Sequence, residues 1–285
     1  MLLNVLFIGN SHTYLHYMPQ MLGELAHTAG KGFRLNADQI TGEGAGLQWH
    51  WNNGPTREKI RSQQWDWVVL QDRSGGPLED LDCFQIHARR LNEEIKQQGA
   101  KTLFYMTWAN KSRPRTQKIV ADAYGQIAAE LSADLAPVGL AWEKSQALDS
   151  ELNLYHIDDR HANPSGAYLT ACVFYAVLFN DSPEGLPATL QIKGKIRLDL
   201  AKDRAGFLQR IAHETVLNAE AGLRPVGAIG AYAPEGMRSD RVWTQSIAHG
   251  ADDRGRNQKS AQPPAKKTAG LIEKETLKKR ISNFE

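Results

Sequence analysis

Short apolar runs alternate along the chain with segments whose apolar residues recur every three or four positions. The runs cover residues 2–8, 65–71, 102–106 and 135–138, and each predicts a strand; residues 33–40 predict a further one. The segments 17–29, 55–63, 81–98 and 115–132 predict helices. Because strands and helices alternate in this way in α/β proteins, we expect a five-stranded parallel sheet with helices on both faces.

The first predicted strand ends abruptly in the polar loop Gly9-Asn10-Ser11-His12-Thr13. In parallel sheets, functional side chains collect just past the carboxyl ends of the strands. Ser11 is therefore a candidate nucleophile. A structural alternative is that Asn10, Ser11 or Thr13 only caps the helix that follows.

A glycine-rich loop over residues 41–47 follows the second predicted strand. It does not fit the G-x-G-x-x-G pattern of dinucleotide-binding loops, and tryptophans follow it instead of a clear helix start. We therefore expect a tight turn in which glycine lets the backbone approach a ligand closely.

The second candidate motif places Asp158 three residues before His161, just ahead of an apolar helical segment that begins near Tyr168. A nucleophilic serine needs a base that removes its proton and an acid that orients the base. His161 and Asp158 have the chemistry for these roles. In the alternative interpretation, Asp158 is a solvated loop acid and Asn163 caps the helix.

Together, Gly9-Asn10-Ser11-His12 and Asp158-x-x-His161 resemble the SGNH (GDSL-type) hydrolase superfamily, in particular its less characterised bacterial branch. The resemblance covers residues 3–180. It implies a three-layer α/β/α, flavodoxin-like fold and the activity of esterases and lipases, some of which deacetylate carbohydrates. It also implies that Ser11 is the nucleophile, His161 the general base and Asp158 the orienting acid.

The same resemblance implies an oxyanion hole made by the Ser11 N–H, a glycine after the second strand and an asparagine after the third. Gly44 matches the glycine best, and Gly46 is the alternative. The asparagine block G-x-N-D is missing. Gln71 stands there with the same amide group, and Arg73 is a second candidate. Since losing one such donor costs about 10²–10³ in turnover, an active enzyme needs a substitute.

Aromatic residues in the loops at the carboxyl edge are candidates for substrate binding. Trp49, Trp51 and Trp108 could stack on a sugar ring or line an acyl pocket, and packing beneath a loop is the alternative. Trp65 and Trp67 begin a strand at the opposite edge, so we interpret them as structural.

The sequence predicts no metal or other cofactor. His12 and His16 have helical spacing but lack a third ligand. Cys83 and Cys172 are isolated, so we expect buried free thiols and not a zinc site or disulfide framework.

Composition narrows the range of partners. The 285 residues carry a net charge of only +2, so we expect no nucleic-acid partner. No segment is apolar enough to cross a membrane, and the first apolar run leads straight into the Ser11 loop. These features predict a cytoplasmic protein without a signal peptide or membrane partner; they do not predict its oligomeric state.

Two domains are expected. Residues 1–222 form the hydrolase-like domain, including an amphipathic helix over 198–217. Residues 223–285 form an irregular, partly disordered extension, and its last 35 residues hold nine Lys/Arg against five Asp/Glu. The extreme end is either a short docking helix or a solvated basic tail.

Two functions are consistent with these patterns. The first is a serine hydrolase that cleaves a small-acyl ester, with a small molecule or a carbohydrate as the alcohol. The second is a catalytically weak or inactive relative that binds a glycan or a partner protein, as the missing asparagine block would allow.

Overall fold

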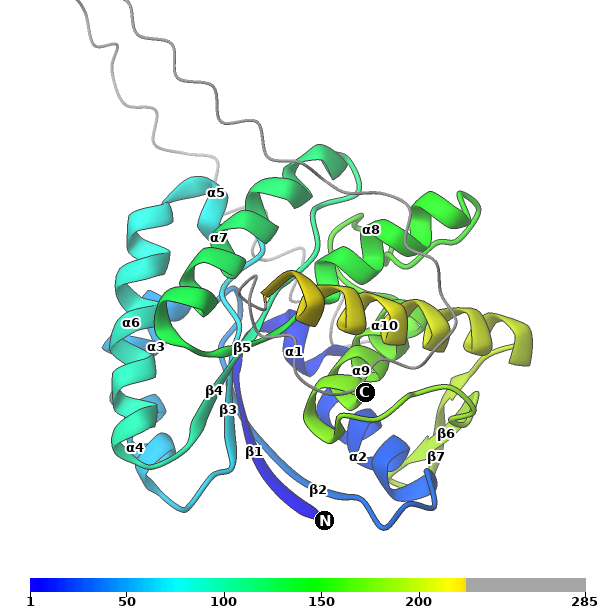
Figure 1. The fold of residues 1–285 in the computed structure, drawn as a ribbon, viewed down its shortest axis with the longest axis horizontal. Coiled ribbons are helices and arrows are strands. Elements are labelled where there is room, and N and C mark those ends of the chain that lie inside the picture. The colour runs from blue at the N-terminus through cyan, green and yellow to red at the C-terminus, as the bar shows by residue number, and fades with distance from the viewer. Residues whose placement is uncertain (224–285) are drawn as a thin grey trace, which may run out of the picture. The chain divides into compact units, whose positions relative to one another are not determined.

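The computed structural model describes residues 1–223. Its main sheet has five strands, all parallel, in the order β2-β1-β3-β4-β5 (Figure 1). They are β1 (Leu2–Gly9), β2 (Arg34–Thr41), β3 (Trp67–Leu70), β4 (Lys101–Tyr105) and β5 (Asp134–Ala136). The predicted α/β class and five-stranded parallel sheet are confirmed. All but the first residue of the expected extension 223–285 lies outside the described residues.

Helices cover both faces of this sheet (Figure 1). Alternate side chains of β1 enter two separate cores, with Val5 and Phe7 in one and Leu6 and Ile8 in the other. The first core is completed by α2 (Met18–Thr28), α8 (Val138–Leu148), α9 (Pro164–Phe179) and α10 (Lys202–Leu223). The second is completed by α3 (Leu47–Asn52), α4 (Gly54–Arg61), α6 (Leu81–Gln97) and α7 (Gln117–Leu131).

Several short elements connect these layers. They are the helices α1 (Ser11–Tyr14) and α5 (Gly76–Glu79), the 3₁₀ turns η1 (Leu15–Tyr17) and η2 (Pro114–Thr116), and the antiparallel pair β6 (Thr189–Ile192) and β7 (Lys195–Asp199). Among residues 1–223, none of the helices has both the length and the apolar composition needed to cross a membrane.

The structure corrects the sequence interpretation at three elements. The glycine loop leads directly into a helix, α3, although its tryptophans did not suggest one. Helix α8 begins at Val138, within the segment 135–138 that was predicted as the fifth strand, and the sequence predicted no helix there. The β6–β7 hairpin was not predicted; its alternating Leu190 and Ile192 point into the core around a turn at Lys193 and Gly194.

The register of the central strands brings three loops to one edge. Ile8 of β1 is paired with Leu70 of β3, and Gly9 is paired with Thr41 of β2. The loops that follow these residues therefore leave the sheet side by side. Ser11, the glycine loop and Gln71 all lie in this region.

Candidate functional site

The turn that carries Ser11 is fixed by its neighbour Asn10. The Asn10 side-chain oxygen accepts a hydrogen bond from the His12 N–H at 3.0 Å, and its amide donates to the Ala45 carbonyl at 2.8 Å. Asn10 is thus the N-cap of α1 and also joins the turn to the glycine loop. Because Asn10 caps the helix, the Ser11 hydroxyl is free for another partner.

A buried histidine supports the same turn from below. His50 Nε2 donates to the Gly9 carbonyl at 2.8 Å, and its Nδ1 accepts from the Thr56 hydroxyl at 3.1 Å. Burial lowers the pKa of His50 to about 4, although the bond to Gly9 opposes this shift. The neutral ring therefore satisfies one donor and one acceptor at the end of β1.

Gln71 lies beneath the turn and is fully buried. Its Oε1 accepts from the Asn10 N–H and from the Thr13 hydroxyl, both at 2.9 Å, and its Nε2 donates to the Asp72 carbonyl. Two donors fix the oxygen toward the serine turn, so the amide nitrogen points the other way. This differs from the expected donor to an oxyanion and makes Gln71 a support for the turn.

Ser11, His161 and Asp158 form a continuous hydrogen-bonded chain. Ser11 Oγ lies 2.8 Å from His161 Nε2, and His161 Nδ1 lies 2.5 Å from Asp158 Oδ2. The two partners of the imidazole thus occupy its two different nitrogens. This arrangement allows the ring to accept a proton from the serine while the carboxylate holds the opposite N–H.

Asp158 is held as a carboxylate. Burial would raise its pKa, but hydrogen bonds from the His161 ring and from the N–H groups of His161 and Arg160 outweigh burial and lower the pKa to about 2. A charged Asp158 stabilises an imidazolium at His161.

The loop that presents this pair is closed on itself. Tyr155 and Ala162 form an antiparallel bridge, and the His156 N–H donates to the His161 carbonyl at 2.8 Å. Asn163 then caps α9, with its side chain accepting from the Gly166 N–H at 3.0 Å. The cap and the acid–histidine pair, which were alternatives in the sequence, therefore occur together.

Trp108 does not line an open surface, contrary to the expectation that it binds substrate. Only 1% of the residue is exposed, and its ring stacks on Trp142 with centroids 3.9 Å apart and planes inclined by 1°. Its Nε1 donates to the Arg160 carbonyl at 2.9 Å. Trp108 therefore anchors the loop that carries His161, because its indole N–H binds this loop while the ring packs against Trp142 and His12.

The other expected substrate contacts lie at the surface. Trp49 is 47% exposed, and the Arg73 guanidinium pairs with Glu79 at 2.7 Å. Gly44 is exposed, with a φ of +61° that favours glycine, and Gly46 packs against the carboxylate of Asp72. Trp49, Arg73 and both glycines lie on the glycine loop and on the loop after β3.

His12 and His16 both approach the His161 loop but not as a metal pair. The His12 ring lies 5.2 Å from the His161 ring, and His16 Nε2 donates to the Ala162 carbonyl at 3.0 Å. Burial, reinforced by the neighbouring His161 and Arg160, lowers the pKa of His12 to about 3. Within residues 1–223, no three His, Cys, Asp or Glu side chains converge where a metal ion could bind. Of the two thiols, Cys172 is buried and Cys83 is partly exposed.

A second group of Ser, His and acid occurs near α10 and can be distinguished from the first. Ser182 Oγ lies 3.1 Å from His213 Nδ1, and Glu184 Oε1 lies 3.3 Å from the same nitrogen. Both partners compete for one ring nitrogen, so the histidine cannot link the serine to the acid. This geometry lacks the relay found at Ser11.

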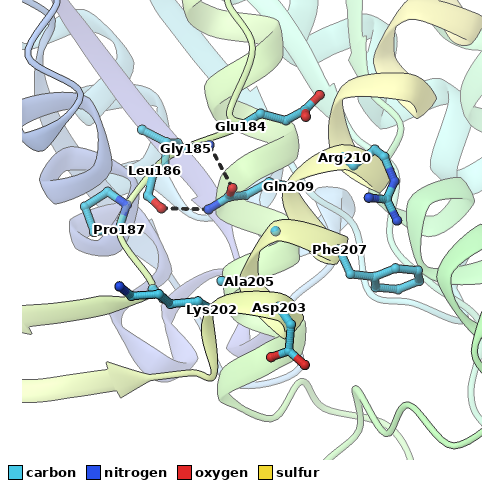
Figure 2. Close-up of a pocket in the computed structure, with 12 residues that line it drawn as sticks. Glu184, Gly185, Leu186, Pro187, Lys202, Asp203, Ala205, Phe207, Gln209 and Arg210 are labelled. Carbon is cyan, nitrogen blue, oxygen red and sulfur yellow. Dashed lines mark hydrogen bonds between the residues drawn. The ribbon is translucent and has the colours of Figure 1, made fainter.

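A hollow of about 690 Å³ lies between the 184–188 segment and the start of α10 (Figure 2). The central polar side chain in it is Gln209, whose Oε1 accepts from the Gly185 N–H and whose Nε2 donates to the Leu186 carbonyl. Its lining has no serine, cysteine or histidine. A smaller pocket lies at the glycine loop.

Comparisons with known proteins point to one superfamily. A protein from Slackia heliotrinireducens, provisionally described as an SGNH hydrolase, matches with a TM-score of 0.52 and 29% identity. The match covers 62% of this chain and 100% of that one. The chain has the SGNH hydrolase fold. The flavodoxin-like, three-layer architecture expected from the sequence is confirmed by this match together with the parallel sheet.

More distant structures share the SGNH hydrolase fold. TesA matches with a TM-score of 0.50 and 16% identity over 61% of this chain and 97% of its own. The acetyl xylan esterase AlAXEase matches with 0.52 and 15% identity over 61% and 99%. No protein-family model matches the chain, and no curated protein matches it.

Proposed function

We propose that this protein is a serine esterase that cleaves small-acyl esters through an acyl-enzyme on Ser11. The observation that carries the proposal is the alignment of Ser11, His161 and Asp158 through two different ring nitrogens. The SGNH hydrolase fold, which this chain shares with an acetyl xylan esterase, is consistent with it.

In the first half of the reaction, Ser11 Oγ attacks the ester carbonyl carbon while His161 Nε2 takes the hydroxyl proton. The carbonyl π electrons move to its oxygen, and Asp158 stabilises the imidazolium that results. When the tetrahedral intermediate collapses, His161 returns the proton to the departing alcohol. The acyl group then remains on Ser11.

In the second half, a water molecule replaces the alcohol. His161 removes a proton from this water as it attacks the acyl carbon, and then gives that proton to Ser11 Oγ as the acid leaves. The serine is regenerated, so each turnover consumes one ester and one water and yields one alcohol and one acid.

The developing oxyanion requires donors near Ser11. The Ser11 N–H is suited to this role because it lies at the first position of α1, where N–H groups have no partner within the helix. We assign the second donor to the Gly44 N–H, with Gly46 as the alternative. Gln71 acts on the hole by holding Asn10 and Thr13 in place.

Hydrolysis of 4-nitrophenyl acetate by three variants tests this proposal. Ser11→Ala and His161→Ala should each lower kcat by at least about 10³-fold, because both remove members of one catalytic unit. His156→Ala is the matched control: His156 lies in the same loop, but its Nδ1 is 4.0 Å from Asp158 Oδ1. Equal turnover by the parent and the Ser11 variant would refute the proposal.

One observation favours the second candidate function, a binding protein with little activity. Within the described residues, Gln71 takes the place of the missing asparagine yet directs its amide into the protein. In this case the purified protein would hydrolyse no ester. Both the parent and the Ser11→Ala protein would still bind to a column that carries an immobilised glycan.

A further inference from the structure

A pocket of about 370 Å³ lies at the glycine loop, which Asn10 joins to the serine turn. Its walls are the glycine loop after β2, the loop after β3 and the start of α6, and they include Trp49, Asp72 and Arg73. Asn10 binds the Ala45 carbonyl in the first wall, and Gln71, which precedes Asp72, binds the Asn10 N–H. Asn10, which precedes the candidate nucleophile, is therefore hydrogen-bonded both to the glycine loop and to the loop after β3, and these two loops form walls of the pocket.

One polar residue of the lining, Asp72, is only 5% exposed. Its Oδ1 accepts from the Leu47 N–H at 3.0 Å and from the Arg73 N–H at 2.8 Å. No donor among residues 1–223 binds its Oδ2. Glycines at 46 and 76 lie against the carboxylate, where any Cβ would clash with it.

The residue is largely buried while its Oδ2 has no donor within the described part of the chain, so this pocket is suited to a ligand that brings one. Burial raises the pKa of Asp72 to about 6, although its two backbone bonds oppose the shift. An acyl chain has no hydrogen to donate. The lining carries both signs of charge, with Asp72 and Asp80 on one side and Arg73, which pairs with Glu79, on the other.

A neutral hydroxyl group satisfies these conditions. The half-exposed indole of Trp49 adds a flat apolar surface at the pocket rim, of the kind on which the C–H face of a polyol or sugar packs. We infer that this pocket binds the alcohol part of the ester and that Asp72 Oδ2 accepts a hydrogen bond from one of its free hydroxyls. This inference rests on the proposed esterase function and adds a substrate class to it.

The first test compares two acetate esters whose alcohols have the same carbon skeleton. Wild-type protein should hydrolyse glycerol monoacetate with a kcat/KM about tenfold or more above that for propyl acetate, as expected for one hydrogen bond to a charged group. Asp72→Asn preserves the size and the Oδ1 bonds but replaces the free acceptor with a donor. It should abolish most of this preference by lowering the kcat/KM for the glycerol ester.

Equal or better hydrolysis of propyl acetate by wild-type protein would overturn the inference, whether or not the Asp72 variant folds. Preferred hydrolysis of acetylcholine would also overturn it, in favour of a cationic alcohol. Asp181→Asn is the control for loss of a carboxylate, because Asp181 pairs with Lys31 at 2.7 Å and does not line the pocket.

A binding measurement separates this inference from the esterase proposal. Saturation-transfer NMR on Ser11→Ala protein should show a signal for glycerol that is stronger than that for 1-propanol, and Asp72→Asn should remove the difference. If no ester is hydrolysed but this difference is present, the esterase proposal fails and the pocket remains a hydroxyl-binding site through Asp72. If esters are hydrolysed without any difference, the pocket assignment fails alone.

Discussion

Three buried side chains, Asn10, His50 and Gln71, hold the turn that presents Ser11. Each one satisfies a backbone group of the turn, so the serine is fixed without using its own hydroxyl. The type of each catalytic candidate was evident from the sequence, because a serine after a strand and an Asp-x-x-His before a helix are short local patterns. The three supports come from separate segments and became evident only in the fold.

Gln71→Met separates a support from an oxyanion donor. The change keeps the side-chain length but leaves the Asn10 N–H and the Thr13 hydroxyl without their acceptor. We expect a loss of about 1–3 kcal/mol in the free energy of unfolding by urea, together with a lower kcat. Thr13→Val, which removes only one of these bonds, should cost less in both. A large loss of kcat with unchanged stability would instead make Gln71 a direct donor.

At the scale of elements, close packing of α9 sets the position of the histidine loop. Gly166, in the first turn of α9, lies against the Leu154 carbonyl and the Trp142 ring, where a Cβ would come within 2.5 Å of the carbonyl oxygen and 2.6 Å of the ring. Leu154 begins the loop that ends in His161. Even one added methyl group between the helix and this loop would therefore displace His161, the candidate base.

Gly166→Ala tests this coupling. Overpacking should cost about 1–3 kcal/mol in stability and also lower kcat, because the loop moves with Leu154. Gly125→Ala is the matched control: Gly125 lies in α7, and a Cβ added there would meet no atom within 4 Å. That variant should gain up to about 1 kcal/mol from helix propensity. Similar effects of the two changes on kcat would contradict the coupling.

Strands β1, β3 and β4 were predictable because their apolar runs are buried from both sides. Helix α8 was not, since Val138–Leu148 follows a three-residue strand and no polar break or cap residue separates the two. The same limit applied to Trp108. Its place after β4 was correctly predicted, but stacking on Trp142, 34 residues later, depends on tertiary packing that no local pattern shows.

At the scale of the whole molecule, buried histidines make the fold sensitive to acid. The pKa of His12 is lowered to about 3 and that of His50 to about 4, chiefly by burial. The unfolded chain takes up protons at these groups near pH 6.5, so the stability they confer is lost as the pH falls below that value. Burial raises the pKa of Asp72 to about 6, so the folded protein takes up a proton there between about pH 6 and 4. This uptake increases the free energy of unfolding as the pH falls, which opposes the effect of the histidines.

The combined effect of His12 and His50 is larger than that of Asp72, so the free energy of unfolding should fall when the pH is lowered from 7 to 5. Each histidine contributes about 2 kcal/mol to this loss. Urea unfolding at both pH values measures it, and His50→Gln should reduce it because glutamine does not titrate. An equal loss in the variant and the parent would show that His50 does not cause the sensitivity.

The two-sided sheet and its superfamily resemblance were accessible from the sequence because both depend on patterns within residues 3–180. The route from Ser11 to Asp72 was not, since it combines a backbone bond, a buried amide and a carboxylate brought together by three parallel strands. The order of the strands therefore determines that Ser11, Gln71 and Asp72, on which the proposed chemistry depends, lie at the same edge of the sheet.

Labelling by a fluorophosphonate, followed by mass spectrometry, tests the central claim most directly, because the reagent reacts preferentially with an activated serine and the labelled residue is identified. We predict one labelled residue, Ser11, and no labelling in Ser11→Ala or His161→Ala protein. An unlabelled but folded parent, or a label on another serine such as Ser182, would contradict the account.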